Sequence, residues 1–236
     1  MRLVKLTSKS KYRIHPKHLI KIEKPWYLEE IKLKDKVLDL GCHNGQRTLK
    51  AAKKCYQVMG VDYNNQELKI ARDSAVDLGI KNIKFAYHNL EKKLELKSQS
   101  FDIVLCLDVL EHIVKRDQLL KEIKRVLKPK GMAYISIPNS QTPWKKLQKK
   151  AGINYYSDPD HKVEYSLNEI KQIFKKSKFK ILKIMPIVYD TPWVGMIDLI
   201  GGLSLGLYQR LTEWKQKKVI NNINKSIGFR IVVIKL

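Results

Sequence analysis

A short apolar run that stops at a glycine-bearing turn is the feature that most constrains the fold of this chain. Residues 36–40 are typical of a strand, and residues 44–54 have the pattern of a helix. Gly41 and Gly45 bracket the turn between them. Such a turn lets the backbone approach a ligand, and the N-terminus of the following helix presents free N–H groups. The segment therefore indicates a nucleotide site, and the absence of a Gly-Lys-Ser/Thr sequence excludes a P-loop.

Strand and helix patterns alternate after this turn. The alternation predicts an α/β fold with a parallel sheet and right-handed crossovers. The apolar run at 101–106 is nearly continuous, as expected for a strand that is covered on both faces. A capping box at Ser166 and Glu169 predicts a further helix, whereas residues 139–164 are expected to form a long polar and aromatic connection. The expected strands are 36–40, 56–61, 83–87, 101–106, 132–137, 179–187 and 229–234, and the expected helices include 65–78, 118–127 and 166–176.

The chain is strongly basic. Its 47 Lys and Arg residues against 23 Asp and Glu residues give a net charge of +24. Such a charge attracts nucleic acid, anionic lipid head groups or acidic small molecules. Because lysine supplies most of the excess and is spread along the chain, a solvated lysine surface explains the charge equally well.

The cysteines and the N-terminus bear on the cellular compartment. Cys42, Cys55 and Cys106 have no spacing that indicates a metal site or a disulfide framework, so no metal is expected. Residues 1–24 are basic and lack the apolar core of a secretory signal. A cytoplasmic location is therefore expected.

Five short motifs follow one another in a fixed order. They are Val37–Gly45, Gly60–Asp62, Phe101–Val104, Asp108–His112 and Leu127–Gly131. This order resembles that of class I S-adenosylmethionine-dependent methyltransferases, and it is most similar to the small-molecule group that includes the ubiquinone and menaquinone enzymes. The resemblance covers roughly residues 35–185.

The resemblance implies a Rossmann-like fold with a seven-stranded, mostly parallel sheet, helices on both faces and an antiparallel last strand. We expect a basic N-terminal arm at residues 1–24 and one methyltransferase domain at residues 25–236. Residues 188–226 would then be a helical apolar insertion between the last two strands.

S-adenosyl-L-methionine is the cofactor that the resemblance implies. The Gly41 turn would contact its amino-acid end, which Asp39 would orient. Asp62 follows about twenty residues on, where a carboxylate accepts hydrogen bonds from ribose hydroxyls. Asn89 and Leu90 would meet the adenine. The expected cofactor-binding set is Asp39, Gly41, Cys42, His43, Gly45, Asp62, Tyr63, Asn89, Leu90, Leu107 and Asp108.

Two of these positions depart from the family pattern. His43 stands where a glycine is common, and histidine adopts a positive φ less freely than glycine. Asn89 stands where an aspartate is common, and its amide oxygen accepts a hydrogen bond without carrying a charge. We therefore expect somewhat weakened cofactor binding or a slightly altered loop.

Three residues are candidates for acid–base chemistry. Methyl transfer from a sulfonium depends on positioning, and a base is needed only when the acceptor must lose a proton. Glu111 and His112 follow the fourth strand, at the edge of the sheet where ligands bind. His161 precedes the helix at 166–176, where similar enzymes often have a histidine that faces the acceptor. Structural roles in the turn and in an exposed loop are the competing interpretations.

The segment 191–218 is unusual for this fold. Its first part is strongly apolar, but Asp198 and several glycines argue against a membrane span. It is interpreted as a helical cover over an apolar substrate, as a membrane-interface element with Trp193 and Trp214 at the boundary, or as a dimer or core surface. The chain is accordingly expected to be a monomer or a homodimer, and to associate peripherally with a membrane if the second interpretation holds.

The predicted function is methyl transfer to a small-molecule or lipid-linked acceptor, with oxygen favoured over carbon or nitrogen. A nucleic-acid methyltransferase is the alternative that the charge suggests, although the chain has no Asn/Asp-Pro-Pro-Tyr/Trp motif of amino-group methylation. A binding or scaffold protein without catalysis is the third alternative.

Overall fold

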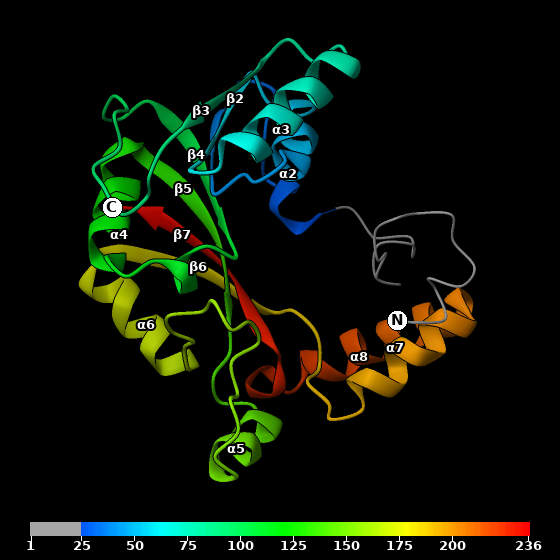
Figure 1. The fold of residues 1–236 in the computed structure, drawn as a ribbon. Helices are drawn as coiled ribbons and strands as arrows, with labels where there is room; N and C mark the ends of the chain where they lie inside the picture. Colours follow the sequence, from blue (N-terminus) through cyan, green and yellow to red (C-terminus); the bar gives the residue numbers. More distant parts are fainter. Residues whose placement is uncertain (1–24) are drawn as a thin grey trace.

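A seven-stranded sheet organises the computed structural model, which describes residues 25–236 except the side chain of Val194 (Figure 1). The strand order is β3-β2-β1-β4-β5-β7-β6. The predicted arm at 1–24 lies outside the described residues. The strands are β1 (Lys36–Leu40), β2 (Gln57–Asp62), β3 (Ile83–Tyr87), β4 (Phe101–Leu107), β5 (Leu127–Pro138), β6 (Phe179–Pro186) and β7 (Gly228–Lys235).

Strands β1 to β5 run parallel, and β7 runs antiparallel to both β5 and β6. The sheet therefore matches the predicted fold, including its antiparallel last strand. In the central pair, Leu38 of β1 lies opposite Val104 of β4, and both are fully buried. Burial on both faces explains why these strands read as continuous apolar runs.

Helices cover both faces of the sheet. The helices are α2 (Gln46–Ala52), α3 (Asn65–Asp77), α4 (Arg116–Val126), α5 (Pro143–Lys150), α6 (Leu167–Lys176), α7 (Val194–Leu203) and α8 (Leu205–Ile220). Short 3-10 turns are η2 (Trp26–Leu28), η3 (Leu110–His112) and η4 (Ile223–Lys225). Apolar residues of α4 and α6 pack on one face and those of η2 and α2 on the other, and Figure 1 shows α4 and α6 together on one side.

Two details correct the expectations from sequence. Residues 139–164 are not simply a connection, because they contain α5, whose N-cap Thr142 accepts a hydrogen bond from the Lys145 N–H and whose first residue is Pro143. Strand β5 begins at Leu127 rather than 132, because Leu127 already pairs with Phe101. Lys130 lies in the irregular first part of β5, and its positive φ of 62° is typical of a turn.

The segment between β6 and β7 forms the helices α7 and α8, as the predicted helical insertion requires. Figure 1 shows both helices extending away from the sheet. Among the described helices, none combines the length and the apolar character needed to cross a bilayer.

Candidate functional site

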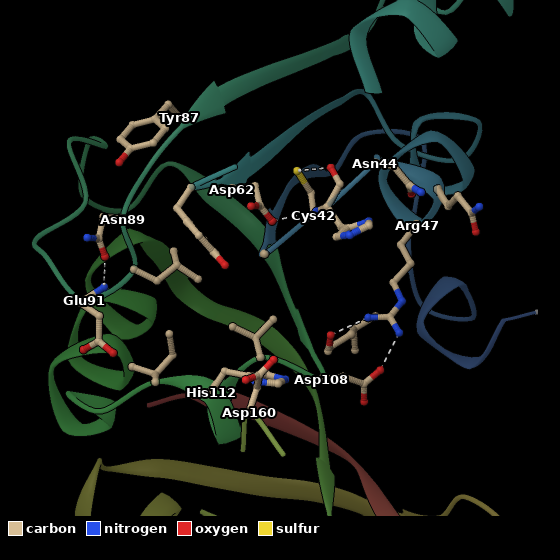
Figure 2. Close-up of a pocket in the computed structure, with 18 of the residues that line it drawn as sticks. Cys42, Asn44, Arg47, Asp62, Tyr87, Asn89, Glu91, Asp108, His112 and Asp160 are labelled. Atoms are coloured by element: carbon tan, nitrogen blue, oxygen red, sulfur yellow. Dashed lines mark hydrogen bonds and ion pairs between the residues drawn. The ribbon is translucent and has the colours of Figure 1, made fainter. Parts of the chain in front are cut away.

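The ends of β1, β2, β3 and β4 open into a cavity of about 960 Å³. This edge is where ligands bind in open α/β sheets, and the volume is near the upper end of the usual range for ligand pockets. Figure 2 shows Asp62, Tyr87 and Asn89 on one side of the cavity and His112 and Asp160 beside each other on another. The site is therefore a single hollow that residues from several strand ends share.

The turn after β1 needs its glycines. Gly41 has a φ of +66°, and a Cβ at this position would lie 2.6 Å from Cγ2 of Val109. Gly45, with a φ of +78°, is the N-cap of α2, and a Cβ there would lie 2.8 Å from Cβ of Ala71. The backbone conformation and the close packing thus both exclude a side chain, which leaves the loop backbone at the cavity wall.

His43 adopts the strained conformation that its position requires. Its φ is +49°, and its side chain points to solvent, with Nδ1 3.2 Å from Oε2 of Glu67. Its backbone N–H donates to Oδ2 of Asp62 over 2.9 Å. His43 thus adopts a positive φ in this loop, and its backbone N–H ties the loop to Asp62.

Asp62 holds the loop in place as well as lining the cavity. Its second oxygen, Oδ1, accepts a hydrogen bond from the N–H of Asn64 over 2.9 Å. Asn64 in turn is the N-cap of α3 and accepts from the N–H groups of Gln66 and Glu67. Because each carboxylate oxygen has two acceptor positions, Asp62 keeps acceptor capacity that can face a diol.

Asn89 and Glu91, in the loop after β3, organise the next part of the cavity wall. Oδ1 of Asn89 accepts from the N–H of Glu91 over 2.9 Å, so the amide NH₂ is the end left to donate. Glu91 accepts from the N–H groups of Val114 and Lys115 over 2.6 and 2.9 Å. These bonds tie the loop after β3 to the loop after β4, and Leu90 lies between them on the cavity wall.

Asp39 lies behind the loop and does not line the cavity. It is almost fully buried, and its Oδ2 accepts a hydrogen bond from Oγ1 of Thr48 over 2.6 Å. Burial raises the pKa of this carboxyl to about 6. Asp39 therefore connects β1 to α2 beneath the turn.

An ion pair separates the main cavity from a second one. Arg47 donates to the Leu107 carbonyl and to Oδ2 of Asp108, both over 2.5 Å. Both partners of this pair also line an adjoining cavity of about 620 Å³, which Trp26, Arg230 and one face of α8 enclose. Oδ1 of Asp108 accepts from Oγ of Ser136 over 2.5 Å, which anchors the pair to β5.

A partly buried histidine pair lies at the main cavity. His112 lines the cavity, and its ring meets that of His161 edge-on with centroids 4.8 Å apart. Nδ1 of His161 lies 2.9 Å from Oε1 of Glu164, whose side chain is fully buried. Glu164 also accepts hydrogen bonds from the Ser157 N–H and the Lys145 ammonium. With Nδ1 donating to Glu164, His161 has the Nε2 acceptor free.

Glu111 completes this group. Only 1% of its surface is exposed, and its Oε2 has no hydrogen-bond partner among the described residues. Burial raises the pKa of Glu111 to about 8, and the nearby Asp108 adds to the shift. Glu111, His112 and His161 also bring ligand atoms to within 4.8 Å of one another, so they are the described residues that could hold a metal ion. The expectation of no metal rested on the spacing of the cysteines, and this group contains no cysteine. The fold brings His161 to Glu111 and His112 from far along the chain, so no short sequence motif contains all three residues.

The predicted site residues fall largely in one place. Of the expected cofactor residues, Asp39 and Gly45 alone do not line the main cavity. Of the candidate bases, His112 lines it, whereas Glu111 and His161 lie behind it. Sequence reasoning missed the lining residues Asn44, Gln46, Arg47, Tyr87, Glu91, Val109, Ile113, Asp160 and Lys162.

The missed residues differ in whether the sequence carried a signal for them. Arg47 is the second residue of the helix that follows the glycine loop, so its place in the first turn, next to the cavity, was available from the sequence. Asp160 and Lys162 line the cavity because the N–H of Lys162 donates to the Glu111 carbonyl over 2.8 Å. Such a contact between distant loops has no local sequence signal.

Comparison with known proteins places this geometry in a family. The model of a methyltransferase domain matches residues 31–187. A ubiquinone biosynthesis O-methyltransferase of Idiomarina loihiensis is 36% identical over 104 residues, which are 44% of this chain and 42% of that protein. The protein of the same name from Yersinia pestis (strain Pestoides F) is 30% identical over 107 residues, 45% of this chain and 44% of that protein. The chain thus spans less than half the length of these relatives.

Solved structures share the fold. A protein of Methanosarcina mazei, described as a SAM-dependent methyltransferase, has a TM-score of 0.63 at 21% identity and covers 91% of this chain and 98% of its own. A putative methyltransferase of Bacillus halodurans has a TM-score of 0.61 at 19% identity and covers 87% and 92% of the two chains. These similarities confirm the class I fold that the motif order predicted. The chain belongs to the methyltransferase domain family.

Proposed function

We propose that this protein transfers a methyl group from S-adenosylmethionine to an oxygen of a small or lipid-linked acceptor. The observation that carries the proposal is that most of the expected donor residues line the same cavity as His112, whose ring contacts that of His161. Relatives over part of the chain are named as O-methyltransferases of ubiquinone biosynthesis, which supports oxygen as the acceptor atom.

The donor would lie along the strand ends. Asp62 would accept from its ribose hydroxyls, and the amide of Asn89 would donate to a ring nitrogen of its adenine. The free N–H groups at the start of α2 and the turn at Gly41 would meet the amino-acid end. These residues occupy consecutive stretches of the cavity wall, which is the arrangement a long nucleoside ligand requires.

A histidine would take the proton. In the transfer, an acceptor oxygen forms a bond to the methyl carbon while the carbon–sulfur bond breaks and its electron pair returns to sulfur. The hydroxyl proton must then leave, and His112 at the cavity wall with His161 behind it offers a path for it. Glu164 would stabilise the charge on His161 after protonation, because its carboxylate lies 2.9 Å from Nδ1.

The adjoining cavity gives the acceptor room. It meets the donor cavity at the Arg47–Asp108 pair and is walled by Trp26, Arg230 and polar residues of α8. An acceptor with polar or anionic groups near its reacting end would fit this lining. Nucleic acid remains a second candidate acceptor because of the net charge of +24, so the assay should include RNA.

Replacing His161 tests the proton path. With a quinol or phenol acceptor, His161→Ala should lower kcat by 10²–10⁴-fold, the usual contribution of a general base. The affinity for S-adenosylmethionine should stay within about twofold, because His161 does not line the cavity. Glu164→Gln should give a smaller loss and a shifted pH profile of kcat. Unchanged turnover in His161→Ala would remove the histidine from the mechanism.

Chelation separates a proton path from a metal site at the same residues. A histidine base predicts that turnover is insensitive to EDTA. Loss of turnover with EDTA, and its recovery with Zn²⁺, would instead indicate that Glu111, His112 and His161 act as metal ligands.

A further inference from the structure

The helices α7 and α8 form a hairpin whose apolar side chains are exposed. Figure 1 shows the pair extending beyond the sheet, and the two helices contact each other along the hairpin. Large apolar side chains of this hairpin normally need a covering surface. The exposed ones are Trp193, Met196, Leu199, Leu203, Leu205, Leu207, Trp214 and Ile220.

One side of α7 is a continuous apolar stripe. Met196, Leu199 and Leu203 lie at helical spacing on one face and are 57%, 48% and 70% exposed. Asp198, the one acidic residue of α7, hydrogen-bonds Tyr208 of α8. Asp198 therefore makes its hydrogen bond between the two helices, and the stripe itself carries no charged side chain.

Helix α8 has two different faces. Gln209, Thr212, Glu213 and Gln216, at helical spacing, line the adjoining cavity. The face away from this cavity carries Arg210, Trp214, Lys217 and Lys218, which are all exposed. The ammonium of Lys218 lies 4.5 Å from the ring centre of Trp214. This face combines cations with an aromatic ring, as helices at a membrane interface do.

We propose that the α7–α8 hairpin docks on the surface of an anionic lipid bilayer. The α7 stripe would enter the boundary of the acyl chains, and Trp193 and Trp214 would lie at the level of the head groups. Arg210, Lys217 and Lys218 would contact lipid phosphates, each adding to the attraction of a surface charged oppositely to the protein.

Charge selects a bilayer over a second copy of the chain. Each copy carries a net charge of +24, and α8, which contacts α7, carries the exposed cations Arg210, Lys217 and Lys218. Two such surfaces would bring like charges together, which opposes association, whereas an anionic membrane attracts the same cations.

The docking has a consequence for the acceptor. Because α8 also walls the adjoining cavity, a docked hairpin would hold that cavity next to the membrane. A lipid-linked acceptor would then reach the cavity without leaving the bilayer. This consequence rests on the proposed function, but the docking itself does not.

Vesicle sedimentation tests the docking. The full chain is mixed with vesicles of phosphatidylcholine alone and with vesicles of equal parts phosphatidylcholine and phosphatidylglycerol. The protein should sediment with the second and at least tenfold less with the first, and binding should weaken as salt is added. Leu199→Glu/Leu203→Glu should reduce binding to the anionic vesicles by tenfold or more.

A matched variant controls for charge and lost apolar surface. Val76→Glu/Leu78→Glu replaces two side chains at the end of α3 that are 78% and 57% exposed, and it should bind like the wild type. Equal binding of the α7 variant and the wild type would overturn the proposal. So would a wild-type dimer by light scattering that the α7 variant abolishes without any vesicle binding. Circular dichroism spectra that are unchanged in all variants show that they are folded, and this readout keeps the test separate from that of the donor site.

Discussion

Three residues of the loop after β1 have a positive φ, and two of them also lie close to neighbouring side chains. Gly41 and Gly45 are fixed by backbone conformation and by the space their neighbours leave. His43 meets the same conformational demand with a φ of +49° and compensates through the bond from its N–H to Asp62. The sequence marks His43 as unusual, and in the structure it lines the cavity with a largely exposed side chain beside Glu67.

Asp39 predicts a pH-dependent stability. Burial raises its pKa from 3.8 to about 6, so the folded state keeps a proton that the unfolded state releases. The free energy of unfolding should therefore fall as pH rises from about 4 to about 6, by up to about 3 kcal/mol, and then stay level. Asp39→Asn has no carboxyl to titrate and should lack this decline. Urea unfolding between pH 4 and pH 7 measures it.

The free energies of unfolding of the wild type and of Asp39→Asn are compared at each pH, because the other carboxyls titrate equally in both proteins. The advantage of Asp39→Asn over the wild type should grow across the window and then stop growing. The exposed Asp73→Asn, which removes only the pair with Lys69, should run parallel to the wild type. Parallel curves for Asp39→Asn would contradict the burial account.

At the scale of elements, a strong local sequence signal was sufficient to predict where a helix begins. The capping box at Ser166 and Glu169 is present, and α6 begins at Leu167. The helix α5 was missed because residues 139–164 were interpreted by their polar composition. Its own start signal, Thr142 followed by Pro143, was nevertheless in the sequence.

The capping box predicts a measurable loss of stability. Ser166 accepts from the Glu169 N–H over 3.2 Å, and α6 buries Ile170 and Phe174 in the core. Ser166→Ala should lower the free energy of unfolding by about 1 kcal/mol and the Tm by roughly 2–4 °C. Differential scanning calorimetry measures both. Ser74→Ala, inside α3 and not at a cap, serves as the control and should not lower the Tm. An unchanged Tm in Ser166→Ala would show that packing alone fixes α6.

At the scale of the whole molecule, topology was predictable and long-range contacts were not. The order of motifs determined the sheet and the edge at which the site lies, because parallel strands present their carboxyl ends together. The ion-paired group of Lys145, His161 and Glu164 joins α5 to the loop that precedes α6. Its members are polar residues within a segment without periodicity, so nothing in the sequence linked them to Glu111 and His112.

The central claim is that the cavity at the strand ends binds S-adenosylmethionine through Asp62. Titration calorimetry of the full chain should show one site for S-adenosylmethionine and one for S-adenosylhomocysteine. Asp62→Ala should weaken both by tenfold or more, because the loss of a carboxylate that accepts from a ligand hydroxyl costs about 1.5–3 kcal/mol. The exposed Asp73→Ala should bind like the wild type. Absence of binding to the folded wild type, or equal binding by Asp62→Ala, would contradict the account.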